Sequence, residues 1–452
     1  MKFWTRKQSD ALGWLIPLIS IMAGIEFLYA ARSGVWKSNA VFPAIPVGIR
    51  LTVTELVIAS FIVFVGGFYL LRRISKTGRM RIAPPGYKRL TTAYLLTLFL
   101  AVGIGVFLRA PDLFTEARVF LIPGSLFFIF LNLSINSKLE EWVVRWFYWL
   151  GIFAFGFGLL MHVSSTVRGI ITFPPEYWMA LYAGTFAWCI AIARLLWRGF
   201  SWRATAVLLL GIAVMIVFLS NKPIVFTMLV TMGVLIVVAM RSNREDIKKR
   251  AWRVALSAPG LIIATLLVLP QSTINQLVGV FARRYLKIWA VSSVQDLQNS
   301  LSEVGQAQDL SAGRFDIWQS YFSESLTGFG LPPDGFGGVP RVYTSLHGWM
   351  EAFPAHNTVA YIAYHGGLIA AVLYASIILR FVIEGFQRIN QIEIDGDYLE
   401  RPELVGVFAF VVGIIAVSLV GGPLLDYRLS WFFWFLTAAL VQRLNRYGSS
   451  GR

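Results

Sequence analysis

Charged residues are scarce in this sequence. Asp, Glu, Lys and Arg make up only 14% of the 452 residues, whereas hydrophobic residues make up 57%. Soluble domains carry about a quarter charged residues, so the composition excludes an ordinary soluble protein. Long apolar runs recur along the chain instead, and about 20 apolar residues suffice to cross a membrane as a helix. The sequence therefore predicts a polytopic, all-α membrane protein.

Cysteine and histidine are also scarce. The single cysteine, Cys189, excludes an internal disulfide framework and a zinc site built from several cysteines. The four histidines are scattered, and there is no Asp-rich run of the kind that holds hard cations. We therefore expect no dedicated metal site and no bound cofactor.

Twelve apolar stretches are predicted to span the membrane. The first one follows Lys2, Arg6 and Lys7, but it is too long for the core of a signal peptide and lacks a clear cleavage site, so we interpret it as a helix. The predicted spans are 11–30, 51–71, 90–108, 117–135, 146–164, 178–197, 204–220, 223–240, 254–271, 357–380, 404–421 and 428–443.

The distribution of Lys and Arg predicts the orientation, because cytoplasmic loops are enriched in these residues. With the N-terminus inside, 27 of the 40 Lys and Arg residues fall in inner segments and 13 outside, five of them in one long outer loop. Both termini are therefore predicted to face the cytoplasm. The net charge of +16 is then a topology signal and an attraction to membrane lipids, and we reject nucleic-acid binding.

These spans divide the chain into three regions. Residues 1–270 form a nine-span region, residues 271–356 a large outer loop, and residues 357–452 a three-span region. Within the loop, residues 293–308 are predicted as a short helix, and "GFGLPPDGFGGVP" is predicted to be irregular because it is rich in Gly and Pro. Long loops of this kind are often functional.

Three polar features lie on the predicted outer side. Lys222 lies in the tight turn "SNKP", Arg314 and Asp316 lie in "GRFDIW", and His356 with Asn357 opens the tenth span. Arginine and lysine bind diphosphate groups well, and histidine can accept a proton from a hydroxyl. The combination predicts transfer from a pyrophosphate-linked donor to an alcohol, with cations stabilising the leaving group.

Each feature also has a purely structural interpretation. Lys222 can extend to lipid head groups, and Arg314 can pair with a loop carboxylate such as Asp316. Asn357 is a good N-cap for the tenth helix. His365, inside that helix, fits an interior hydrogen-bonded histidine.

Two further arginines, Arg283 and Arg284, lie in "FARRYLKIW" near the start of the outer loop. They are interpreted as residues facing lipid head groups, and they could help to gather an anionic donor.

The string "GRFDIWQSYFSESLTGFGLPPDGFG", followed after a gap by "AHNTVAYIAYHGGLIAAVLY", resembles the O-antigen ligase and polymerase superfamily of bacterial envelope glycosyltransferases. The twelve-span layout with one large loop matches this superfamily as well. The residues that match its motifs are Gly313, Arg314, Trp318, Leu326, Gly328, Gly330, His356, Asn357, Gly366, Gly367, Leu368 and Ile369.

The resemblance implies a C-type glycosyltransferase fold in the bacterial inner membrane, with a periplasmic active site. It implies a glycan donor on undecaprenyl diphosphate, used without a metal. Arg314 matches the family's loop arginine that contacts the diphosphate, and His356 matches its essential histidine. Two positions depart from the family. Lys222 stands near a usual arginine, and His365 stands where glutamate is frequent.

Several functions remain open. A ligase that moves a finished glycan to lipid A–core is favoured, because O-antigen polymerases typically have two large outer loops, whereas this chain is predicted to have one. The alternatives within the superfamily are a polymerase that extends a growing lipid-linked glycan and a protein O-oligosaccharyltransferase. A lipid-linked glycan transporter is the alternative outside it, although transporters usually show internal repeats and charged midplane helices.

Overall fold

The computed structural model describes most of the chain beyond residue 84. The described residues are 85–110, 113–132, 137–168, 177–217, 222–268, 275, 314–327, 332, 335–336, 341–344, 348–351, 357–389, 401–420, 424 and 427–449. The predicted spans 11–30 and 51–71 and the predicted helix 293–308 lie outside these residues.

The described part of the chain is almost entirely helical, as predicted. Helices lie at the positions of the ten remaining predicted spans, with α14 and α15 together at the tenth, and α13 lies within the predicted outer loop. The helices are α4 (Pro85–Phe107), α5 (Leu113–Asn132), α6 (Ser137–Arg168), α7 (Tyr177–Arg198), α8 (Trp202–Val217), α9 (Lys222–Met240), α10 (Glu245–Val268), α13 (Arg314–Thr327), α14 (Thr358–Gly366), α15 (Leu368–Arg388), α16 (Arg401–Ser418) and α17 (Tyr427–Ser449).

Two helices begin well before the apolar stretches that predicted them. Helix α6 has Glu140 in its first turn, and α10 has Glu245 and Asp246 in its first turn. Negative side chains stabilise a helix N-terminus, because the unpaired amides there carry partial positive charge. This effect extends both helices into the charged segments that precede the apolar residues.

Among the described residues, four helices are long and apolar enough to cross a membrane. They are Gly86–Phe107, Glu140–Leu160, Pro223–Met240 and Leu368–Arg388. Their outward faces carry large apolar side chains such as Phe99 and Phe153, which are 57% and 68% exposed. Large exposed apolar surfaces of this kind mark contact with a membrane or a partner. The protein is therefore a helical membrane protein, while the twelve-span topology and the C-type fold stay predictions.

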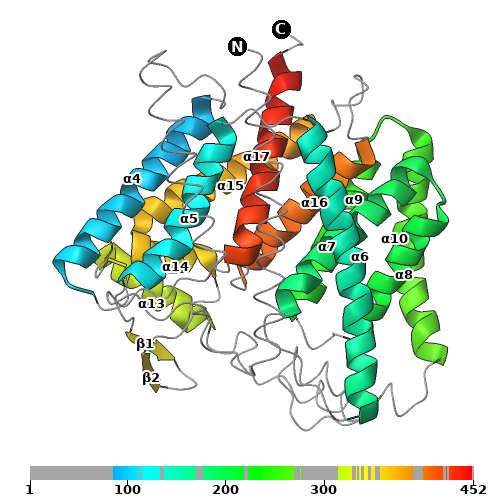
Figure 1. The fold of residues 1–452 in the computed structure, drawn as a ribbon, viewed down its shortest axis with the longest axis horizontal. Coiled ribbons are helices and arrows are strands. Elements are labelled where there is room, and N and C mark those ends of the chain that lie inside the picture. The colour runs from blue at the N-terminus through cyan, green and yellow to red at the C-terminus, as the bar shows by residue number, and fades with distance from the viewer. Residues whose placement is uncertain are drawn as a thin grey trace, which may run out of the picture.

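The helices pack as two groups joined along α16 and α17 (Figure 1). In one group α4 packs on α5 and α15, and α5 packs on α17. In the other, α7 packs on α6, α8 and α16, and α9 packs on α10 and α16. Glycine permits the closest contact between α6 and α7, since a Cβ atom on Gly151 would lie 2.1 Å from the carbonyl oxygen of Ala183. Small residues allow membrane helices to approach in this way.

Polar contacts join helix ends that were predicted to lie on the same, inner side. Glu140 near the start of α6 accepts a hydrogen bond of 2.5 Å from Arg443 near the end of α17. Arg194 in the last turns of α7 pairs with Glu403 at the start of α16 at 2.9 Å. In Figure 1, α13 and the strand pair lie at the opposite end of the helices from the C-terminal end of α17. The packing agrees with the predicted alternation of helix direction, and the two compartments stay a prediction.

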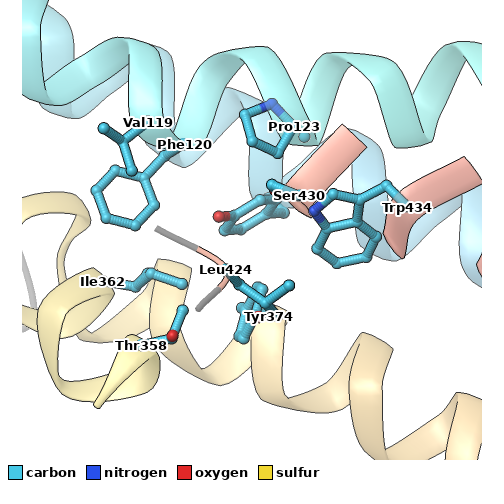
Figure 2. A pocket seen from close by; sticks show the side chains of 11 residues that line it. Val119, Phe120, Pro123, Thr358, Ile362, Tyr374, Leu424, Ser430 and Trp434 are labelled. Carbon is cyan, nitrogen blue, oxygen red and sulfur yellow. The ribbon is translucent and has the colours of Figure 1, made fainter. Parts of the chain in front are cut away.

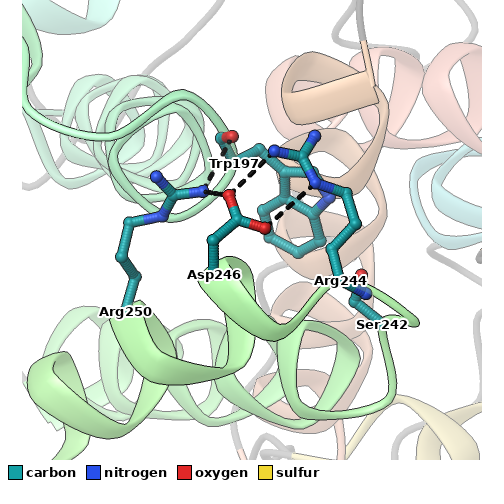
Figure 3. A network of polar contacts seen from close by, with 5 residues as sticks. All are labelled: Trp197, Ser242, Arg244, Asp246 and Arg250. Carbon is teal, nitrogen blue, oxygen red and sulfur yellow. Dashed lines mark hydrogen bonds and ion pairs between the residues drawn. The ribbon is translucent and has the colours of Figure 1, made fainter.

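A small ionic network holds the start of α10 against the end of α7 (Figure 3). Asp246 accepts hydrogen bonds from Arg244, at 3.1 and 2.8 Å, and from Arg250. Arg250 Nη2 also donates to the carbonyl oxygen of Trp197 at 3.3 Å. The hydrogen bonds from Arg244, followed by the nearby positive charges, lower the pKa of the Asp246 carboxyl. The Asp246 side chain is therefore negatively charged at neutral pH.

Two features of the second half differ from the sequence expectation. A two-stranded antiparallel hairpin, β1 (Arg341–Thr344) and β2 (Gly348–Glu351), adds a short sheet beside α13. The predicted single span 357–380 is interrupted at Gly367, which has φ +88° and ψ 158°. This region of backbone conformation is open essentially only to glycine, so the chain divides there into α14 and α15.

Candidate functional site

The segments that carry the family-like motifs meet at one end of the helices. Helix α13 packs against α14, and Ile317, Tyr321, Ala360 and Tyr364 form a separate buried cluster between them. Ser325 Oγ, near the end of α13, lies 2.6 Å from the carbonyl oxygen of Ala363, to which it donates. Ile317 is one turn after Arg314 in α13, and Ala360 follows His356 by four residues in the sequence. The packing therefore joins two motifs that lie about 40 residues apart in the sequence.

The Gly-Pro-rich segment between these helices also docks there. The described residues of this segment are neither helix nor strand, as predicted. Gly335 has φ +66°, and a Cβ atom on it would lie 2.5 Å from the backbone nitrogen of Gly105 in α4. Phe336 is fully buried, and its ring lies 5.5 Å from the ring of Phe120 in α5. Only glycine fits at position 335, because both the backbone conformation and the space require it.

We expect Gly105→Ala to weaken the docking of this segment. A Cβ atom on Gly105 would lie 2.5 Å from the carbonyl oxygen of Phe336, whereas a Cβ atom on Gly103 meets no atom within 4 Å. Alanine favours an exposed helix by about 1 kcal/mol over glycine, so Gly103→Ala is the matched control. Overpacking at Gly105 should cost about 1–3 kcal/mol. The unfolding midpoint in detergent should fall for Gly105→Ala and stay or rise for Gly103→Ala. Equal midpoints would contradict the docking.

His365 lies at the centre of this region. It is fully buried, and its Nδ1 atom lies 2.9 Å from Oε2 of Glu116 in the first turn of α5. The contact has the distance of an ion pair without the geometry of a hydrogen bond, and Nε2 has no hydrogen-bond partner. Tyr361 donates to Oε1 of the same glutamate at 3.4 Å. The ring of Phe336 lies parallel to the imidazole at 6.4 Å. His365 is thus an interior histidine, as predicted, but a carboxylate accompanies it instead of a regular hydrogen bond.

Glu116 is the residue of this site that the sequence analysis missed. The signal was present, since an acidic residue at the edge of an apolar span is by default a functional candidate. In the superfamily that the sequence resembles, a glutamate is frequent at the position of His365. Here the histidine occupies that position, and α5 supplies the carboxylate beside it.

Asn357 caps α14, which confirms the structural interpretation of this residue. Its Oδ1 atom accepts hydrogen bonds from the backbone amides of Val359 at 2.9 Å and Ala360 at 3.1 Å. Its extended backbone conformation, with φ −147° and ψ 115°, is typical of an N-cap. The cap fixes the direction in which the chain enters α14, immediately after His356.

The other predicted site residues are placed by their positions along the helices. Arg314 is the first residue of α13, and Asp316 lies in its first turn. Lys222 is the first residue of α9. Asp316 lies in α13, which packs on α14. In the described part of the chain α9 packs mainly on α7, α10 and α16, and it makes no extensive contact with α13 or α14. Joint binding of a diphosphate by Lys222 and Arg314 stays a prediction. His356, Arg283 and Arg284 lie outside the described residues.

The titration of Tyr321 limits the choice of a proton acceptor. Burial raises the pKa of its phenol above the usual range, and the negative charges of Glu116 and Glu324 raise it further. The phenol therefore stays protonated at neutral pH and is a donor of hydrogen bonds.

Among the described residues no group of three or more His, Cys, Asp or Glu side chains is arranged to hold a metal ion.

A cavity adjoins the motif region between α4, α5, α14, α15 and α17 (Figure 2). The first residue of α14, Thr358, contributes to its wall. The lining residues are Tyr94, Val119, Phe120, Pro123, Gly124, Thr358, Ile362, Tyr374, Leu424, Ser430 and Trp434. The wall is mostly aromatic and aliphatic, with a few hydroxyl groups.

Comparison with known proteins adds no assignment. No protein-family model matches the chain, and no curated protein matches it in sequence.

Proposed function

We propose that this chain is a glycosyltransferase that moves a glycan from undecaprenyl diphosphate to a hydroxyl acceptor, and that it is an O-antigen ligase acting on lipid A–core. The observation that supports the proposal is the convergence of the two helices that carry family-like motifs with part of the segment between them. Helix α13, the residues Gly335 and Phe336, and helix α14 pack together at one end of a helical membrane protein. The family resemblance of these segments supplies the chemistry.

In the proposed reaction an acceptor hydroxyl attacks the anomeric carbon of the donor glycan. The bond between that carbon and the diphosphate oxygen breaks, and undecaprenyl diphosphate leaves. His356 accepts the proton of the attacking hydroxyl, because its ordinary pKa lies near neutral pH. Arg314 stabilises the negative charge that develops on the diphosphate, and Lys222 is proposed to assist. Asn357, which caps α14, directly follows His356 in the sequence.

The location of the protein follows from the same proposal. Residues predicted on the outer side, such as those of α13 and α14, would face the periplasm, and both termini would face the cytoplasm. The membrane would be the bacterial inner membrane, where polyprenyl-linked glycans are presented on the outer surface.

A reconstituted transfer assay tests the function directly. The full-length protein in detergent or liposomes receives undecaprenyl-diphosphate glycan with lipid A–core in the presence of EDTA, and the products are resolved by mass. We expect glycan attached to lipid A–core, with release of undecaprenyl diphosphate. A ladder of longer glycans on undecaprenyl diphosphate would identify a polymerase instead. Movement of intact donor across the liposome membrane, without a new covalent product, would overturn the transferase proposal.

A further inference from the structure

Three hydroxyl groups in the wall of the cavity of Figure 2 are buried without a hydrogen-bond partner. They belong to Thr358 at the start of α14, Tyr374 in α15 and Ser430 in the first turn of α17. All three residues are at least 96% buried. Burying an unpaired hydroxyl is unfavourable, so three of them around one cavity indicate a binding site for a polar group.

The positions of Thr358 and Ser430 in their helices explain why neither hydroxyl bonds to a carbonyl of its own helix. Buried threonines elsewhere in the chain donate to the carbonyl four residues earlier, as Thr91, Thr185 and Thr437 do at 2.8–3.0 Å. Thr358 is the first residue of α14 and Ser430 is the fourth of α17. The residue four positions earlier therefore lies outside the helix in both cases, and this back-bond is lost.

The phenol of Tyr374 is in the same situation for a different reason. A tyrosine hydroxyl is too far from its own backbone to bond with it, so it needs a partner from another element. The ring of Tyr94 packs beside it at 5.9 Å, and the ring of Trp434 packs at 6.0 Å. These neighbours are aromatic faces and edges, and they leave the phenol oxygen without an acceptor or donor.

We infer that this cavity binds a single hydroxyl-sized oxygen through Thr358, Tyr374 and Ser430. The space between the side chains admits one group about the size of a water molecule. A hydroxyl group both donates and accepts hydrogen bonds, so it can pair with three protein hydroxyls at once. The oxygen comes either from one ordered water molecule or from a carbohydrate.

The carbohydrate source rests on the proposed function and deepens it. Thr358 follows His356, the proposed proton acceptor, by only two positions. The three hydroxyls suit a single hydroxyl group of a sugar, because the space admits only one such group. On this reading the cavity orients the acceptor saccharide.

The first experiment tests occupancy without requiring activity. The substitutions Thr358→Val, Tyr374→Phe and Ser430→Ala each remove one hydroxyl and retain most of the shape, and Thr437→Val is the control because its hydroxyl bonds within α17. The unfolding midpoint of the full-length protein is measured in detergent. We expect a lower midpoint for each cavity variant than for the control. The double variant of Tyr374 and Ser430 should lose less than the sum, because both bind one ligand. An unchanged or raised midpoint for the cavity variants would show an empty cavity and overturn the inference.

The second experiment identifies the source of the oxygen. In the transfer assay, Ser430→Ala should raise the KM for the acceptor roughly fivefold at unchanged kcat if a carbohydrate hydroxyl binds there. An unchanged KM together with a lowered midpoint would assign the site to an ordered water. If the unsubstituted protein transfers no glycan, the proposed function fails, while the unfolding experiment still decides whether the hydroxyl site exists.

Discussion

Replacing Glu140 with glutamine is expected to destabilise the protein strongly. Glu140 and Arg443 form an ion pair whose side chains are only 5% and 7% exposed. The substitution leaves the Arg443 guanidinium buried without its counter-charge. Breaking a buried pair in this way costs about 3–5 kcal/mol, so the unfolding midpoint in detergent should fall clearly below that of the unsubstituted protein.

The adjacent residue provides the matched control. Glu141 forms an ion pair with Arg145 one turn along α6, but the Arg145 side chain is 70% exposed. Exposed pairs contribute about 0–1 kcal/mol, so Glu141→Gln should leave the midpoint nearly unchanged. Replacing both partners of the buried pair by apolar residues, as in Glu140→Leu with Arg443→Met, should recover much of the loss. Similar midpoints for Glu140→Gln and Glu141→Gln would contradict a stabilising role for the buried pair.

Local sequence signals predicted the apolar helices of the described part of the chain and one cap correctly, but they did not predict α13 in the outer loop. A run of about 20 apolar residues forms a helix in a membrane whatever its partners are, because its backbone polar groups must be satisfied internally. Asn357 precedes such a run directly, and its short amide side chain can reach the free backbone amides behind it. Both features depend on neighbouring residues alone, so they can be read without knowledge of the packing.

The contacts between distant segments could not be predicted in this way. His365 lies beside Glu116, and Arg443 beside Glu140, although more than 200 residues separate the partners of each pair. Neither pairing leaves a periodic signal in the sequence, since it depends on which helices become neighbours. The interruption at Gly367 was equally hidden, because a glycine within an apolar run fits both a continuous helix and a break.

The candidate site shows the same division between local and distant information. Motif spacing proposed the segments of α13 and α14 as parts of one site, and the structure packs the two helices against each other. Spacing did not indicate that Phe336 would be inserted between Phe120 and His365, or that α5 would contribute a carboxylate. The sequence analysis placed Lys222 in the site from its predicted side of the membrane and from its position near an arginine that is usual in the resembled family, and both arguments are weaker than packing.

Replacing Arg314 with alanine is expected to abolish most glycan transfer while leaving the fold intact. Arg314 is the first residue of α13, so the substitution changes the end of the helix and leaves its interior unchanged. The buried cluster that holds α13 on α14 begins one turn later at Ile317. The expected loss therefore reflects chemistry: a cation that stabilises the leaving diphosphate contributes about 2–4 kcal/mol to the transition state, which corresponds to roughly a 30- to 1000-fold decrease in rate.

Another arginine of the same outer region separates this effect from a general loss of positive charge. Arg341 is the first residue of β1 and lies opposite Glu351 in the hairpin. Arg341→Ala removes the same charge and should retain transfer within a few-fold, whereas Arg314→Ala should not. The unfolding midpoints of both variants are measured first, to show that each is as stable as the unsubstituted protein. Initial rates are then compared in the transfer assay. Equal rates for the two variants would remove Arg314 from the proposed donor site. A loss confined to Arg314→Ala would tie the diphosphate to the start of α13, one turn from the packed α13–α14 cluster.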